Sequence, residues 1–211
     1  MALSSPPAPF PAFNVTTLPA GAQLVRLHDP TYQGDQFNPC AGSPSRFSPL
    51  KQPDGTCLPT LYAADRFEAA VHESIFHDQP YGHARKYVSI DKIVSRAVSE
   101  IAVTADLTLA QLHQADLMLL GLSRSDLIDT DATHYVLTAR WAEAFHRANS
   151  TISGLVWTSR RCDPDQAYVL FADRVPKTAL TVKKTTLVST SSALLLEIRG
   201  FAKRAGITIT L

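Results

Sequence analysis

Apolar residues recur at every second position, or in short runs, in several stretches of the chain, which is the pattern of half-buried or buried strands. The first two stretches are GAQLVRLHD (21–29) and TLYAA (60–64). Further strand-like stretches lie within 85–103, which holds two, and at 106–112, 153–160, 166–173 and 206–211. The sequence therefore predicts a sheet built from several short strands.

Other stretches repeat apolar residues with the 3.6-residue period of an amphipathic helix. They are residues 65–77, 133–149 and 192–205. In the first, Asp65 and Glu68 form a capping-box pattern, so we expect that helix to begin at Asp65. Glu73 then falls at the flank of the apolar face, beside Ala69 and Ala70. Since strands and helices follow no repeating order, we expect an α+β fold with a compact mixed β-sheet core and flanking helices.

Two segments fit neither pattern. Residues 1–20 are rich in proline and poor in charge, so they predict an N-terminal arm, flexible or wrapped around the domain. Residues 21–211 show no firm internal boundary and are expected to form a single domain. Residues 30–59 are rich in Pro, Gly, Ser and Asn, and so long a loop usually serves a function or is disordered. Its Phe, Tyr and Arg residues favour a binding loop.

Composition narrows the classes of partner. The 211 residues are 45% hydrophobic and 18% charged, with a formal net charge of +1, which favours neither nucleic acid nor a membrane surface as the main partner. The start, MALSSPPAPFPAF, lacks the basic and apolar regions of a secretory signal, so we expect a cytoplasmic protein. The three cysteines are odd in number and widely spaced, which predicts reduced thiols and no disulfide framework.

Several common catalytic motifs are absent from the sequence. There is no Walker A loop, no GxGxxG after a strand, no HExxH and no GxSxG. His72 and His77 are five residues apart and do not share a helical face, so we expect no catalytic metal. What remains is a set of arginine, tyrosine, glutamate and serine residues, each of which also has an ordinary structural explanation: Arg26, Arg46, Tyr62, Glu73, Ser159 and Arg160.

The order of the motifs around these residues resembles the RES domain, found in toxins of bacterial toxin–antitoxin pairs. The motifs are LVRLHDP, SRFSP, LYAADRFEAAVHESIFH, GLVWTSRR and AYVLF, and the resemblance covers about residues 22–175. It implies an ADP-ribosyltransferase-like fold, NAD as the substrate without another cofactor, and an Xre-like helix-turn-helix antitoxin as partner. The chain departs from the family in its N-terminal arm and in the insertion at 48–59, and residues 95–130 show no family motif.

The resemblance also implies roles for individual residues. It assigns catalysis to Glu73, Arg46, Tyr62 and Ser159. The chemistry of NAD suggests the contacts: Arg26 and Arg46 are the first candidates to bind the pyrophosphate, with Arg160 in reserve, because arginine forks suit phosphate oxygens. Tyr62 could stack on the nicotinamide ring, and Ser159 could orient Glu73 or hydrogen-bond the ligand. His77, one turn beyond Glu73, could tune that carboxylate or stabilise the helix end.

The residue set suits the cleavage of NAD. Nicotinamide is a cation in NAD and leaves as a neutral ring, so no acid is needed to protonate the leaving group and one carboxylate, Glu73, is sufficient. Three alternatives stay open at this point. The protein could degrade NAD by hydrolysis or phosphorolysis, transfer ADP-ribose to a protein, or act as a non-enzymatic module that binds a partner.

Overall fold

The computed structural model describes residues 3–80 and 85–211. Residues 1 and 2 of the expected arm lie outside this part of the chain. Among the described residues, no helix combines the length and the apolar character that crossing a membrane would require.

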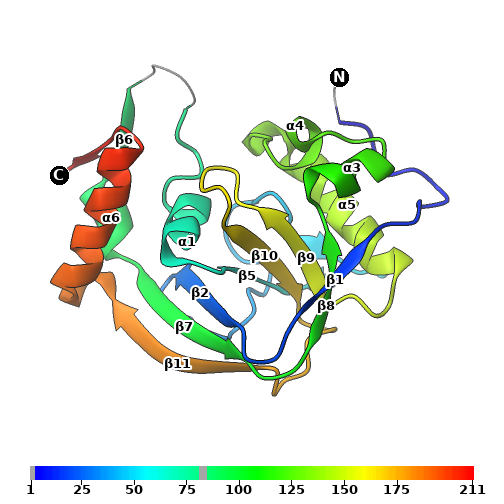
Figure 1. Cartoon of the computed structure of the whole chain (residues 1–211), viewed down its shortest axis with the longest axis horizontal. Coiled ribbons are helices and arrows are strands. Elements are labelled where there is room, and N and C mark those ends of the chain that lie inside the picture. Colours follow the sequence, from blue (N-terminus) through cyan, green and yellow to red (C-terminus); the bar gives the residue numbers. More distant parts are fainter. Residues whose placement is uncertain (1–2, 81–84) are drawn as a thin grey trace.

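A large curved sheet organises the molecule (Figure 1). Within the described residues its strand order is β1-β8-β9-β10-β5-β2-β7-β11. Neighbouring strands are antiparallel except for β8 and β9, which are parallel. The strands are β1 (Val15–Leu18), β2 (Gln23–His28), β5 (Thr60–Ala64), β7 (Ala97–Val103), β8 (Leu107–Gln111), β9 (Gly154–Thr158), β10 (Gln166–Phe171) and β11 (Leu180–Leu187).

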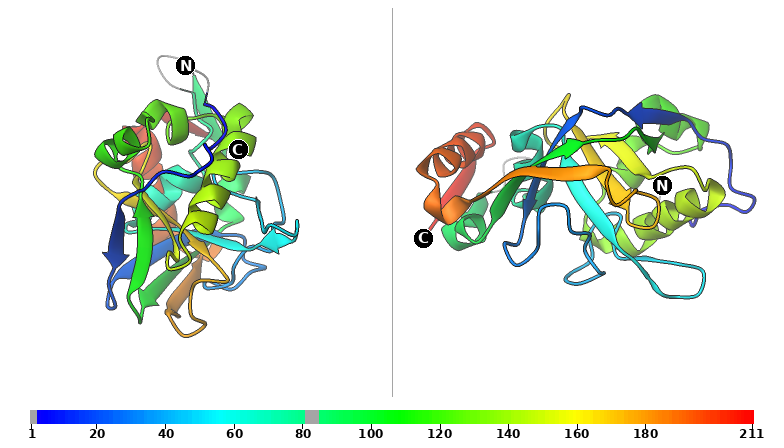
Figure 2. Two further views of the ribbon diagram at one scale, coloured as in Figure 1. Left: turned by 90° about the vertical axis from the view of Figure 1, so that its right-hand side faces the viewer. Right: turned by 90° about the horizontal axis from the view of Figure 1, so that it is seen from below.

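The remaining elements surround this sheet. The helices are α1 (Phe67–Ser74), α2 (Ile90–Val94), α3 (Gln114–Leu119), α4 (Arg124–Leu127), α5 (Tyr135–Ala148) and α6 (Ser192–Arg204), with short 3-10 turns η1 (Ala132–His134) and η2 (Val188–Thr190). Two small sheets pair β3 (Leu50–Lys51) with β4 (Cys57–Leu58), and β6 (Lys86–Ser89) with β12 (Ile207–Thr210). Helix α6 lies at one end of the molecule and α5 at the other, with α1 between them (Figures 1 and 2).

The predicted α+β class and its mixed sheet are confirmed, and most predicted strands and helices are present. Four strands, β1, β3, β4 and β11, were not predicted. The longest of them, β11, was missed because its residues, LTVKKTTL, are mostly exposed or half-buried and carry two lysines. It pairs with β7 along one side only and ends the sheet. Charged side chains are a common protection of such edge strands, and they hide the apolar alternation on which the prediction relies.

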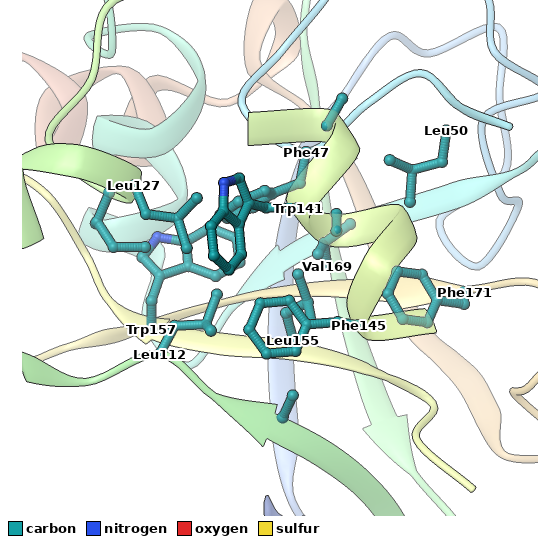
Figure 3. Close-up of a cluster of buried hydrophobic side chains, with 14 of the residues drawn as sticks. Phe47, Leu50, Leu112, Leu127, Trp141, Phe145, Leu155, Trp157, Val169 and Phe171 are labelled. Carbon is teal, nitrogen blue, oxygen red and sulfur yellow. The ribbon is translucent and has the colours of Figure 1, made fainter. Parts of the chain in front are cut away.

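The largest aromatic side chains gather between α5 and the sheet (Figure 3). Trp141 and Phe145 of α5 pack in one cluster with Trp157 of β9. Phe47, from the long loop, is also fully buried in this cluster, with its ring centroid 5.2 Å from that of Trp157. The loop is therefore anchored in the core immediately beside Arg46.

Over the described residues 3–18, the N-terminal segment packs against the domain. Leu3 is buried in the aromatic cluster, and the Trp141 indole N–H donates to the Ser4 carbonyl at 2.8 Å. The Phe10 and Phe13 rings contact Phe145 edge to face. The segment then continues as β1, which pairs with β8 at the edge of the main sheet.

The predicted capping box of α1 is wrong. The N-cap residue is Arg66, and no side chain caps the helix. Asp65 instead accepts a hydrogen bond from the Gln166 backbone N–H at 3.0 Å, which ties the start of the helix to β10. Glu68 contacts Arg204 of α6. Both acidic side chains that the local pattern assigned to the cap therefore bind partners from other elements instead.

The expectation of reduced cysteines is also wrong for two of the three. Cys40 and Cys57 form a disulfide with a Cα–Cα distance of 6.1 Å, while Cys162 is free. The two cysteines are 17 residues apart in the sequence, and the pairing of β3 with β4 brings them together. Spacing alone could not show this, because the loop between them doubles back on itself.

Breaking this disulfide should lower the stability of the protein. Closing a loop of this length removes chain entropy from the unfolded state worth about 3 kcal/mol, and in a chain of this size each kcal/mol shifts the melting temperature by about 2–4 °C. We expect Cys57→Ser to melt roughly 6–12 °C below the wild type in thermal denaturation. Cys162→Ser is the matched control and should melt near the wild type. Equal melting of Cys57→Ser and wild type would show that the disulfide does not constrain the loop.

Candidate active site

Helix α1 brings Glu73 close to the sheet. Ala69 and Ala70 are buried and pack with Ala64 of β5 and with Val25 and Leu27 of β2. Small side chains at this contact allow the helix to lie near the strands. Glu73, one turn further on, therefore stands over the sheet at the flank of the buried face, as the helical pattern predicted.

Three groups hold the Glu73 carboxylate. Its Oε1 accepts hydrogen bonds from Ser159 Oγ and from the Arg160 backbone N–H, both at 2.8 Å. Its Oε2 pairs with Arg46 Nη1 at 3.2 Å. The side chain of Glu73 is 13% exposed and that of Arg46 is 5% exposed. Glu73 is thus a fixed, largely buried carboxylate and not a solvated surface acid.

The charge state of Glu73 follows from these contacts. Burial acts to raise the pKa of Glu73, but the Arg46 charge and the hydrogen bonds from Ser159 and Arg160 outweigh it and hold the pKa below its ordinary value. The carboxylate is therefore ionised at neutral pH although little water reaches it.

Ser159 and Arg160 are positioned by the end of β9. Ser159 is fully buried, and its backbone N–H donates to the Asp165 carbonyl at 2.8 Å. The Arg160 side chain points elsewhere, since its Nη1 donates to the Thr130 carbonyl at 2.8 Å. Arg160 therefore reaches Glu73 through its backbone, a contact that residue type does not reveal.

Arg124 of α4 is a supporting residue that the sequence did not indicate. Its Nη2 donates to the carbonyls of Thr158 and Ser159 at 3.1 Å each, and its Nε pairs with Asp129 at 3.3 Å. These bonds fix the chain at the point where β9 ends. Arg124 lies in the stretch 95–130 that carried no motif, so no signal in the sequence marked it.

Tyr62 of β5 joins the loop to the sheet. Its hydroxyl oxygen accepts hydrogen bonds from the Phe47 backbone N–H at 2.8 Å and from Ser45 Oγ at 3.2 Å. Burial raises the pKa of Tyr62 to about 12, so the phenol stays neutral. Tyr62 therefore contributes to the position of Arg46, which lies between the two loop residues that it binds.

A hollow of about 300 Å³ opens beside these residues. Its lining includes Arg46, Tyr62, Glu73, His77, Arg96 and Tyr135, together with hydroxyl groups of the long loop. The volume lies at the lower end of the range found for small-molecule sites. A second hollow, between residues 5–10 and α5, contains none of the predicted site residues.

Comparison with known proteins places the chain in a family. The model of the RES domain matches residues 23–192, most of the chain. The chain belongs to the RES-domain family. Among solved structures, the crystal structure of the M. tuberculosis MbcT–MbcA toxin–antitoxin complex contains a similar fold, with a TM-score of 0.61, 17% sequence identity, and coverage of 87% of this chain and 92% of that chain. No curated protein matches the chain.

Four of the six predicted site residues come together through their side chains in this RES domain. Arg160 joins them through its backbone N–H, and Arg26 does not join them. Arg46, Tyr62, Glu73 and Ser159 contact one another directly or through the loop. Successive side chains of a strand point to opposite faces, so Leu27 lines the hollow and Arg26 faces the other side of β2.

Arg26 instead holds the base of the long loop. Its Nη1 donates to the carbonyls of Gly34 at 2.9 Å and Gln36 at 2.6 Å, and burial lowers the pKa of Arg26 to about 10. A Cβ at Gly34 would lie 2.4 Å from Ser99 Oγ, so the loop passes β7 too closely for another residue. Arg26 therefore positions the loop that carries Arg46.

His77 lines the hollow of the RES domain and also stabilises the end of α1. Its Nδ1 lies 2.5 Å from the Ser74 carbonyl, and its Nε2 lies 2.9 Å from Asp78 Oδ2. Burial lowers the pKa of His77, which favours the neutral ring at pH 7. Both alternatives considered from the sequence are therefore compatible with its place.

Proposed function

We propose that this RES domain degrades NAD by cleaving the bond between nicotinamide and ribose, with water or phosphate as the acceptor. The observation that carries the proposal is the buried, ionised Glu73, which Arg46, Ser159 and the Arg160 backbone hold at the wall of a hollow.

The proposed reaction uses the charge already present in NAD. The electron pair of the C–N bond moves to the pyridinium nitrogen, so nicotinamide leaves as a neutral molecule without an added proton. Positive charge develops on the ribose, and the fixed Glu73 carboxylate stabilises it electrostatically. Water or phosphate then forms the new bond at the same ribose carbon, and with water a proton is released to solvent.

The neighbouring residues have supporting roles in this proposal. Arg46 and Ser159 fix the two oxygens of Glu73, so the carboxylate needs little reorganisation during the reaction. Tyr62 presents an aromatic side chain to the hollow, suited to contact with the nicotinamide ring. No cofactor besides the substrate NAD is required.

Loss of NAD would make the protein a toxin to its own cell, and we propose a protein partner that blocks it. The fold is similar to that of a chain in a toxin–antitoxin complex, and this supports an antitoxin partner. Following the family resemblance, we propose an Xre-like helix-turn-helix protein. We propose that the RES-domain protein itself acts in the cytoplasm, where NAD is available.

Product analysis tests the proposed function. We expect the purified protein to release nicotinamide from NAD, with ADP-ribose as the second product in water or ADP-ribose phosphate when phosphate is present. NAD labelled in the adenosine part and liquid chromatography with mass spectrometry identify these products. A labelled protein band in a bacterial lysate, with little free ADP-ribose, would instead indicate ADP-ribosylation of a protein. NAD that stays intact in both assays would favour a non-enzymatic, partner-binding module.

A further inference from the structure

Arg96 is an arginine of the hollow to which sequence reasoning assigned no role. It precedes β7 and lines the same hollow as Arg46 and Glu73. Leu27 of β2 pairs with Val98 of β7, so the two side chains share a face of the sheet. Arg96 lies two residues before Val98, and the two-residue period of a strand places it on this face as well.

Among the described residues, the guanidinium of Arg96 lacks the hydrogen-bond or ion-pair partners that the neighbouring arginines have. Arg26 binds loop carbonyls, Arg46 binds Glu73 and Arg160 binds the Thr130 carbonyl. Across the described residues, Arg96 makes no side-chain hydrogen bond or ion pair, although the residue is half-buried.

The carboxylate whose pKa Arg96 affects, that of Asp29, already accepts hydrogen bonds from another residue. The charge of Arg96 acts on the pKa of Asp29, but the Asp29 Oδ1 accepts hydrogen bonds from the Thr31 backbone N–H at 2.9 Å and from Thr31 Oγ1 at 2.7 Å. Arg96 therefore presents a cationic group with its donors available, at the side of a hollow whose carboxylate, Glu73, is itself neutralised by Arg46.

We propose that Arg96 binds the pyrophosphate of the dinucleotide, a role for which the sequence offered Arg26, Arg46 and Arg160 as candidates. This inference rests on the proposed function. The pyrophosphate carries two negative charges, and a guanidinium fork matches the geometry of phosphate oxygens. Ser43, an exposed loop residue, also lines the hollow and offers a hydroxyl donor. Arg96 is thus a substrate-binding residue and Arg26 a positioning residue.

Steady-state kinetics with NAD separate these roles. We expect Arg96→Gln to raise KM for NAD about 10- to 100-fold, the effect of losing one or two charge-assisted hydrogen bonds, with kcat nearly unchanged. Arg96→Lys should recover part of the loss, because it keeps the charge and loses the fork. The control is Lys92→Gln, which removes an equal charge from α2 outside the lining and should keep the wild-type KM. A fall in kcat at unchanged KM, or a raised KM for phosphate alone, would overturn the proposal.

Binding measurements distinguish a failure of this inference from a failure of the proposed function. ADP-ribose contains the pyrophosphate but lacks the nicotinamide–ribose bond that the reaction cleaves. Adenosine lacks both the pyrophosphate and that bond. By calorimetry we expect ADP-ribose to bind Arg96→Gln about 10- to 100-fold more weakly than the wild type, with adenosine unaffected by the change. Equal affinity of both proteins for ADP-ribose would overturn the role of Arg96. A wild type that binds ADP-ribose through Arg96 but leaves NAD intact would overturn the reaction alone.

Discussion

Replacing Glu73 with Gln should reduce the rate of NAD cleavage by about a hundredfold or more, the usual cost of removing one positioned electrostatic group. The Gln side chain has nearly the same shape, and its carbonyl oxygen can still accept from Ser159 Oγ and the Arg160 N–H. It lacks the negative charge that would stabilise the developing cation on the ribose. Release of nicotinamide, measured by chromatography, gives the rate.

The control for this variant must address folding, since Glu73→Gln leaves the buried Arg46 without its counter-ion. Breaking a buried pair on one side typically costs about 3–5 kcal/mol. The double variant Glu73→Gln, Arg46→Met removes both charges and should regain much of that stability while staying inactive. Wild-type NAD cleavage by a folded Glu73→Gln protein would exclude Glu73 as the catalytic carboxylate.

The low pKa of Glu73 also predicts how the wild type responds to acid. The folded-state pKa is depressed, so the carboxylate contributes stability that is present above the unfolded-state pKa and is lost as the pH falls through the folded-state pKa. Activity requires the same ionised form. NAD cleavage limited by this group should therefore persist below pH 4.5, the ordinary value of the carboxyl, and fail only at still lower pH.

Replacing Arg46 with Ala should also lower the rate of NAD cleavage, on the order of a hundredfold. Arg46 fixes Oε2 of Glu73, and its charge opposes the effect of burial on the pKa of that carboxyl. Without Arg46, burial should dominate and raise the pKa of Glu73. The remaining activity should then be lost at a higher pH than in the wild type, as pH–rate profiles would show.

Arg140→Ala is the matched control for Arg46→Ala. Arg140 is an exposed arginine of α5, outside the lining of the active-site hollow, and its loss should leave both the rate and the pH profile unchanged. A residual activity of Arg46→Ala with the wild-type pH dependence would mean that Arg46 does not control the ionisation of Glu73.

The sequence by itself determined the local features of the site. The period of apolar residues predicted the helix that carries Glu73 and placed that residue at the flank of the buried face. The order of the motifs around Arg46, Tyr62 and Ser159 indicated the family, which the match over residues 23–192 confirms. These features depend on neighbours within a few residues or on residue type, and such information is written directly in the chain.

Only the tertiary structure decided which side chains are free to act. Arg26 lies in β2 and Arg96 lies directly before β7, both beside the loop. With β2 paired to β7, Arg26 faces the loop carbonyls and Arg96 faces the hollow. Arg160 contacts Glu73 through its backbone, and Cys40 meets Cys57 because the loop doubles back. Each outcome depends on partners distant in sequence, since burial and hydrogen bonding are settled by packing and not by local pattern.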